Sequence, residues 1–328
     1  MQTPWQTFLD QLGAVRKGDV VEHFHGGNNA SVLVGDHLSI IQVRGDDTEK
    51  FLQGQLTCDF KHILAGETRL AMHLSLKGRG MSSFRVLPAP GGMDLVTPRS
   101  HLDDALKALK KYAMFSKVTL ELDAQRVPLL FLGDAGYDLL HGYDIPVPQQ
   151  PKAALFAEHT SIARLENGQR YLLLIDHAHA QKMLQQIPVA ELGAAQQWQL
   201  NNIAAGEGHL ENGGQDLWLP QILNYDVLDG VNFKKGCYLG QEIVARMHFK
   251  GQLKQRMHRL NWPREDVAVG DTLRNEDGKA VGEVVAAVSV SDFTEALVVL
   301  RLDHQGPLFF NDKALQHKIV SLPYRLPA

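Results

Sequence analysis

The chain has 328 residues, of which 44% are hydrophobic and 21% charged, and its formal net charge is −4. This composition is typical of a soluble globular protein with two or three domains, and the bulk charge gives no sign of nucleic-acid binding. Two cysteines are too few for a disulfide framework or, alone, for a metal cluster. We find no apolar run of membrane-spanning length and no signal peptide, so we expect a cytoplasmic protein without a membrane partner.

Hydrophobic periodicity predicts mixed helices and strands over the first 205 residues. The expected helices are 5–15, a helix capped by Asp46 or Asp47 that runs through Leu56, 102–112, 177–186 and 196–205. The expected strands are 32–34, 38–44, 69–76, 82–88, 93–97, 118–122, 127–132 and 170–175. We predict that the histidine-containing stretch 23–29 is an exposed loop.

Two changes of character divide the chain. The proline-rich segment 145–151 is a candidate linker, and short strands separated by polar turns follow Gln252. We therefore predict an α+β protein with domains over 1–145, 146–250 and 251–328. The last of these has the pattern of a small antiparallel barrel or sandwich.

The segment 232–242 carries the most distinctive chemistry. Cys237 follows Lys234 and Lys235, lies between two glycines and precedes a segment with helical periodicity. A thiol near a helix N-terminus and beside fixed positive charge ionises readily, and the glycines allow close backbone approach. This predicts an exposed, activated thiol, although most free cysteines are small buried hydrophobes, and the local sequence leaves the two interpretations even. Cys58, which has no flanking base, is predicted to be buried.

Basic residues gather in the region 234–259, where Glu242 is the only carboxylate. They are Lys234, Lys235, Arg246, Lys250, Lys254, Arg256 and Arg259. Such a patch can bind phosphates or RNA, but a solvated face is the commoner explanation. The usual motifs of serine hydrolases, zinc proteases, P-loop proteins and dinucleotide-binding proteins do not occur, and a Cys–His dyad remains open.

The segment 234–242 resembles the KGCYxGQE signature of the YgfZ family, folate-binding proteins related to the glycine-cleavage aminomethyltransferases. The residues that carry this resemblance are Lys234, Lys235, Gly236, Cys237, Tyr238, Gly240, Gln241 and Glu242. Segments 44–57 and 110–118 extend the resemblance, which runs from about Val32 to Pro323.

The resemblance implies an aminomethyltransferase-like α+β fold, arranged around a central hole that binds tetrahydrofolate or a folate derivative, with a C-terminal antiparallel β-barrel. It also implies a role in supporting iron–sulfur enzymes, including those that methylthiolate tRNA. Cys237 is then the functional thiol, and Trp198 lines the folate site, where an indole could stack on the pterin. Without the resemblance, Trp198 would be interpreted as a core residue of an amphipathic helix.

Three positions depart from the related proteins. Leu38 stands where the family has a second folate-site tryptophan, and Ser82-Ser83 stands where the aminomethyltransferases have a catalytic aspartate. Ala204 stands where those enzymes keep a glutamate for the pterin ring. A chain without these carboxylates should not carry out aminomethyl transfer. Two alternatives to an accessory protein stay open: a folate-dependent one-carbon transferase that uses other residues, and a module that binds tRNA directly through the 234–259 patch.

Overall fold

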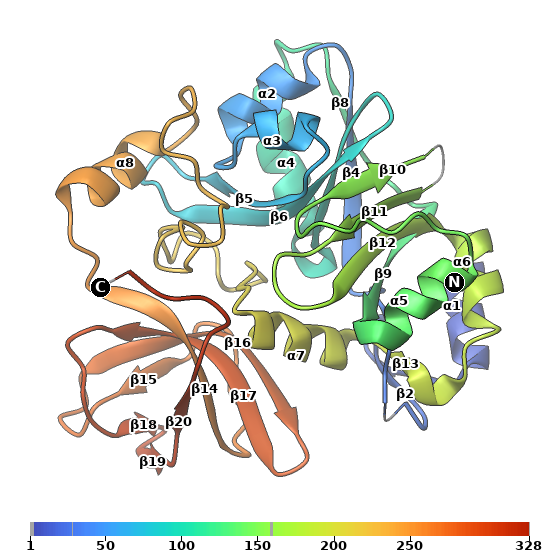
Figure 1. The fold of residues 1–328 in the computed structure, drawn as a ribbon. Coiled ribbons are helices and arrows are strands. Elements are labelled where there is room, and N and C mark those ends of the chain that lie inside the picture. The colour runs from blue at the N-terminus through green and yellow to red at the C-terminus, as the bar shows by residue number, and fades with distance from the viewer. Residues whose placement is uncertain (1–2, 28, 158–159, 328) are drawn as a thin grey trace. The chain divides into compact units, whose positions relative to one another are not determined.

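The computed structural model describes residues 3–27, 29–157 and 160–327 (Figure 1). They form two compact units. Unit 1 comprises Met1–Leu52, Phe60–Arg69 and Arg85–Trp198, and unit 2 comprises Gln53–Asp59, Leu70–Phe84 and Gln199–Ala328. Because these six segments alternate, the chain passes between the units five times. The three domains expected from the sequence stay a prediction.

Unit 1 contains a six-stranded sheet of the order β10-β11-β12-β9-β3-β13. The described pairs are antiparallel apart from β13 with β3, which is parallel. The strands are β3 (Val32–Val34), β9 (Arg126–Leu132), β10 (Ala154–Phe156), β11 (Thr160–Arg164), β12 (Arg170–Asp176) and β13 (Leu192–Gly193). In a second sheet, β4 (Leu38–Arg44) pairs with β7 (Gly92–Pro98) and β8 (Thr119–Leu122), and residues 85–89 of β6 (Gly80–Ala89) pair along β7.

Helices pack on both sheets of unit 1. On the six-stranded sheet, α5 (Gly133–Gly142) and α6 (His177–Leu184) contact β9 and β12, whereas α4 (Leu102–Ala113) contacts β8 of the second sheet. Other helices of the unit are α1 (Pro4–Gln11) and α3 (Phe60–Leu64), while α2 (Thr48–Gln55) and α7 (Ala195–Ala205) each span a unit boundary in the sequence. Trp5, Phe8 and Leu9 of α1 lie in the largest apolar core of the unit, together with Phe131 and Leu173 of the sheet. Their helical spacing gives α1 one apolar face, as the sequence predicted.

The N-terminal hairpin corrects one expectation. β2 (Val20–Phe24) pairs with β1 (Ala14–Lys17), so His23 and Phe24 lie in a strand and not in a loop. The expected loop also included Asn28, which lies outside the described residues.

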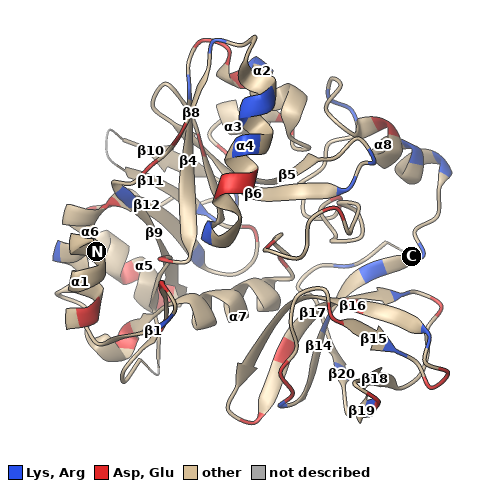
Figure 2. Cartoon of the chain, turned by 180° about the vertical axis from the view of Figure 1, so that it is seen from behind, with Lys and Arg blue, Asp and Glu red and all other residues tan. Residues whose placement is uncertain are grey.

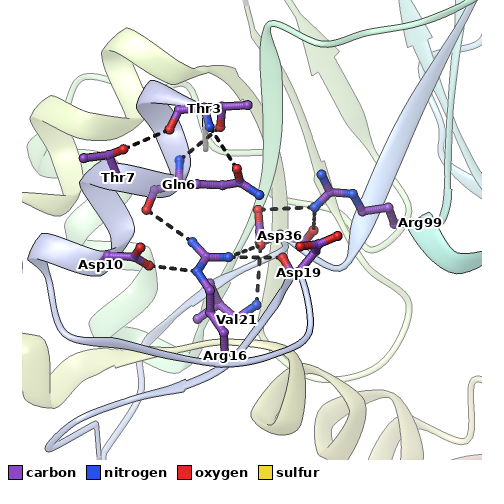
Figure 3. A network of polar contacts seen from close by, with 9 residues as sticks. All are labelled: Thr3, Gln6, Thr7, Asp10, Arg16, Asp19, Val21, Asp36 and Arg99. Atoms are coloured by element: carbon purple, nitrogen blue, oxygen red, sulfur yellow. Dashed lines mark hydrogen bonds and ion pairs between the residues drawn. The ribbon is translucent and has the colours of Figure 1, made fainter. Parts of the chain in front are cut away.

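An ion-pair network around the buried Asp36 holds this hairpin to the rest of unit 1 (Figure 3). Arg16 Nη1 lies 3.4 Å from Asp36 Oδ2, and Arg16 Nε lies 2.8 Å from Asp10 Oδ1. Arg99 Nη1 approaches the other Asp36 oxygen at 3.7 Å. Two guanidinium groups thus compensate the buried Asp36 carboxylate, which would be costly to bury alone. Asp10 and Arg16, which lie in the part of the chain that the family resemblance leaves uncovered, are therefore tied into the fold.

Unit 2 contains an antiparallel sheet of seven strands in the order β19-β18-β15-β16-β17-β14-β20, which is strongly curled in Figure 1. The strands are β14 (Gln255–Pro263), β15 (Thr272–Arg274), β16 (Ala280–Val290), β17 (Phe293–Arg301), β18 (Leu308–Phe310), β19 (Lys313–Leu315) and β20 (Lys318–Val320). The antiparallel C-terminal sheet predicted from the sequence is confirmed, whereas its closure into a barrel stays a prediction.

Within the seven-stranded sheet, β17 is buried on both faces. Along β17, Ala296 and Val298 belong to one apolar cluster, and Leu297 and Val299 belong to another. This alternation follows from the two-residue period of a strand. The second cluster also contains Trp218 and Tyr225 from the connection 206–240, and Leu70, Met72 and Leu74 of β5 (Arg69–Leu74). It is the core on which the 232–242 segment rests.

Candidate functional site

Cys237 is exposed and lies in unit 2, on a loop that precedes α8 (Gln241–Lys250). Cys58 is fully buried, as its sequence context predicted. The helical periodicity after the thiol is also confirmed, because α8 begins at Gln241 with Gly240 as its N-cap. Exposure is the first requirement for a thiol that reacts with another molecule.

The loop 232–240 is fastened to the segment 53–59 by backbone hydrogen bonds. The Asn232 N–H donates to the carbonyl of Thr57 at 2.9 Å, and the Leu239 N–H donates to that of Gly54 at 3.1 Å. The side-chain oxygen of Asn232 accepts from the N–H groups of Lys234 and Lys235 at 2.7 and 2.9 Å. Such an asparagine turn bends the chain directly ahead of the thiol.

Lys235 is buried, which its position beside an exposed cysteine did not suggest. Its Nζ donates to the carbonyls of Gln53, Leu56 and Cys58 at 2.7, 2.6 and 2.7 Å. The first of these belongs to the last turn of α2, and carbonyls at a helix C-terminus favour a cation. Burial lowers the pKa of the Lys235 ammonium to about 8, while Cys58 and Asp59 act in the opposite direction.

The two glycines beside the thiol differ. Gly240 has φ +76°, and a Cβ there would lie 2.5 Å from the carbonyl oxygen of Ser75 and 3.1 Å from Gly78 Cα. A Cβ on Gly236 would have no atom within 4 Å. Only Gly240 therefore needs to be glycine, because the turn after β5 packs directly against it.

Gln241 and Tyr238 form the transition from the loop to α8. Gln241 Oε1 accepts from the Tyr238 N–H at 3.1 Å, and the Gln241 N–H donates to the Tyr238 carbonyl at 3.1 Å. Tyr238 is buried, with its ring centroid 4.9 Å from the Lys235 ammonium, and Glu242 provides the acidic residue of the first turn. Gln241 and Tyr238 thus fix the loop at the start of α8, and Glu242 places a negative charge at the positive end of the helix dipole.

The basic patch expected over 234–259 is smaller than the sequence suggests. Arg256 is buried and paired with Asp226, and Arg259 Nε lies 2.9 Å from Glu295. With Lys235 also buried, four of the seven basic side chains remain exposed, namely Lys234, Arg246, Lys250 and Lys254. Figure 2 shows basic residues along α8 and in the segment that follows it.

Trp198 belongs to unit 1 and is 5% exposed. It lies in an apolar cluster with Leu33 and Leu130, and its ring meets the His37 ring edge to face at a centroid distance of 5.4 Å. Leu38, the other position implied for the folate site, packs against the same cluster. Trp198 and Leu38 thus share one apolar cluster, in which Trp198 has the burial of a core residue, and its role toward folate stays a prediction.

Ser82, Ser83 and Ala204 occupy the positions where the aminomethyltransferases have carboxylates. Ser82 and Ser83 are buried in β6, and Ser83 Oγ accepts a hydrogen bond from the Leu210 N–H at 2.8 Å. Ala204 is exposed. Sequence reasoning missed Glu211, which directly follows Leu210 and whose carboxyl pKa is raised by burial. Glu211 is half-buried, and its position next to a glycine-rich turn gave no sign of this shift.

Among the described residues we find no group of three or more His, Cys, Asp or Glu side chains that could hold a metal ion. Nor does any described helix combine the length and hydropathy that crossing a membrane requires.

Comparison of the whole fold finds a close structural match. The crystal structure of glycine cleavage system aminomethyltransferase T from Bartonella henselae superposes with a TM-score of 0.77, over 98% of this chain and 97% of that one, at 16% sequence identity. The expected aminomethyltransferase-like fold with mixed α and β content is therefore confirmed. At this identity the match establishes the fold alone.

Comparison of sequences identifies nearer relatives, although no family model matches. The tRNA-modifying protein YgfZ of Klebsiella pneumoniae (strain 342) is 34% identical over 308 residues, which cover 90% of this chain and 93% of the relative. The protein of the same name from Escherichia coli O127:H6 is 33% identical over 305 residues, with 90% and 94% covered. Identity at this level over nearly the full length of both chains confirms the resemblance seen in the motif, and the chain belongs to the YgfZ family.

Proposed function

We propose that this chain is a cytoplasmic, folate-binding accessory protein that supports iron–sulfur enzymes and, through them, the methylthiolation of tRNA. Cys237 is its reactive thiol. The names of the relatives support the link to tRNA modification, and the aminomethyltransferase-like fold supports folate binding. The observation that carries the thiol role is the exposure of Cys237 on a loop whose neighbouring residues are anchored in the core.

The thiol role is tested by replacing Cys237 with serine. We expect Cys237→Ser to lose the ability to restore methylthiolated tRNA in a deletion strain, with fold and folate affinity nearly unchanged, because the side chain is exposed. Cys58→Ala, which removes the buried thiol, is the matched control and should retain activity. Full complementation by Cys237→Ser would show that the thiol has no role.

The folate role rests on the apolar cluster around Trp198. Tetrahydrofolate would pack its pterin against Trp198 and Leu38, with Leu38 giving an apolar contact where a second indole would stack. We expect tetrahydrofolate to quench tryptophan fluorescence in the wild type and in Trp262→Phe, but much less in Trp198→Phe. Trp262 is a suitable control because it is buried in the other unit. Absence of quenching and of calorimetric heat in the wild type would contradict folate binding.

The missing carboxylates favour an accessory protein over a transferase. Ser83 is buried, and its hydroxyl accepts a hydrogen bond from the backbone. A serine hydroxyl cannot replace the carboxylate that the aminomethyltransferases have at this position. We expect no folate-dependent methylene or formyl transfer from the purified protein. Turnover in such an assay would favour the one-carbon transferase.

Direct contact with tRNA is a second candidate, favoured by the exposure of Lys250, Lys254 and Phe249, which is 66% exposed. Cations beside an aromatic ring can bind phosphates and stack on an unpaired base. We expect salt-sensitive binding that weakens in a Lys250→Gln, Lys254→Gln double variant. No binding of tRNA even at low salt would remove this candidate.

A further inference from the structure

We propose that Lys235 is a positioning residue, which fixes the loop 232–240 on the segment 53–58 and thereby determines where the Cys237 thiol stands. This inference deepens the proposed function and depends on it for its biological meaning. The loop geometry, however, is tested separately from tRNA modification.

All three N–H donors of the Lys235 ammonium group make hydrogen bonds. A lysine has three N–H donors and no acceptor, and the three donors of Lys235 meet three backbone carbonyls at 2.6 to 2.7 Å. Two of these carbonyls belong to Leu56 and Cys58, which are fully buried. Loss of the amine would remove all three of these hydrogen bonds, two of which join Lys235 to fully buried residues, and each such bond contributes to holding the loop. No donor of Lys235 is left for a hydrogen bond to the thiol.

Anchors lie on both sides of Cys237. On one side is Lys235, two residues earlier, and on the other is Tyr238, which is 6% exposed and whose ring lies under the same ammonium group. Gly240 follows, in contact with the backbone of Ser75. The exposed thiol is therefore carried on a short span whose two ends are fixed in the core of unit 2. The neighbouring cation Lys234 is exposed and offers a matched control of equal charge.

The test places a nitroxide spin label on Cys237, because the fully buried Cys58 should not react. We expect a restricted label in the wild type and in Lys234→Met, and a mobile label in both Lys235→Met and Lys235→Arg. Arginine keeps the charge but cannot direct three donors from one nitrogen. Circular dichroism verifies that each variant is folded.

Hydrogen exchange provides a second measure on unlabelled protein. The Asn232 and Leu239 amides, which donate to Thr57 and Gly54, should exchange about tenfold faster or more in Lys235→Met but not in Lys234→Met. Unchanged label mobility and exchange in folded Lys235→Met would overturn the proposal. So would full rescue by Lys235→Arg, because charge and not position would then be the cause.

If the Lys235 variants fail to fold, the proposal can be tested on the wild-type protein. Acetic anhydride should modify Lys235 about tenfold more slowly than Lys234, since the Lys235 amine is buried and hydrogen-bonded. Equal rates would overturn the proposal. If Cys237→Ser complements fully while these loop measurements hold, the thiol role fails and the positioning by Lys235 stands.

Discussion

Arg256 provides a stringent test of how unit 2 is stabilised. Its Nη1 donates to Gln221 O, Asn224 Oδ1 and Asp226 Oδ1 at 2.9, 3.2 and 3.0 Å, and its Nη2 donates to Asp226 Oδ2 at 2.8 Å. The Arg256 and Asp226 side chains are 7% and 10% exposed. Replacing the arginine with methionine leaves a buried carboxylate uncompensated, and we expect Arg256→Met to lower the free energy of unfolding of unit 2 by about 3–5 kcal/mol.

The assay must report on unit 2, because a chain with two units need not unfold in one step. Hydrogen exchange of the β14 amides gives the opening free energy of the sheet that carries Arg256, and urea denaturation gives the midpoint. Lys254→Met, an exposed substitution two residues away, should change stability by about 0.5 kcal/mol or less. Arg256→Met combined with Asp226→Leu should recover much of the loss, because an apolar pair replaces both charges.

A loss below about 1 kcal/mol in Arg256→Met would refute this reasoning, since an uncompensated buried charge cannot cost so little. So would a double variant no more stable than the single one. The expected result also bears on tRNA binding. Weakened binding by an Arg256 variant would report damage to the fold and would not identify a contact with RNA.

Two further predictions concern the surroundings of the thiol loop. Gly240→Ala should lower the free energy of unfolding by about 2 kcal/mol or more, because Gly240 has a positive φ and lies close to the Ser75 oxygen. Gly236→Ala should change the free energy of unfolding by about 0.5 kcal/mol or less. Equal urea midpoints for the two variants would contradict this packing. Burial lowers the pKa of His73 to about 4, so the unfolded state binds its proton first and stability should fall by up to about 3 kcal/mol as the pH decreases from about 6.5 to about 4. Denaturation across this range should show a flatter dependence for His73→Gln, and identical slopes would rule out His73 as the cause.

Local sequence patterns predicted much of the fold. Helical spacing identified α1, and short strands separated by polar turns identified the antiparallel C-terminal sheet. The helix α5 was missed because Gly133, Gly136 and Gly142 reduce its intrinsic helix propensity, although packing of Leu140 in the core stabilises it. Local propensity gives no measure of that tertiary contribution.

The candidate site was predictable only in part. The exposed thiol and the helix after it follow from residues adjacent in sequence. The burial of Lys235 and Arg256 does not, because their partners are distant in the chain and a cation beside polar residues ordinarily faces solvent. Sequence charge alone therefore overestimated the basic surface.

The alternation of the chain between the two units also has a consequence for biosynthesis. The Cys58 carbonyl and the Lys235 amine that binds it are 177 residues apart. At about 5–20 residues per second, a ribosome needs roughly 9–35 s to advance from one to the other. During that interval Leu70, Met72 and Leu74 lack the later partners of their apolar cluster. The hydrogen bonds that hold the thiol loop on the segment 53–58 therefore form late in translation. A chain stalled on the ribosome before Lys235 would lack both Cys237 and the lysine that positions it.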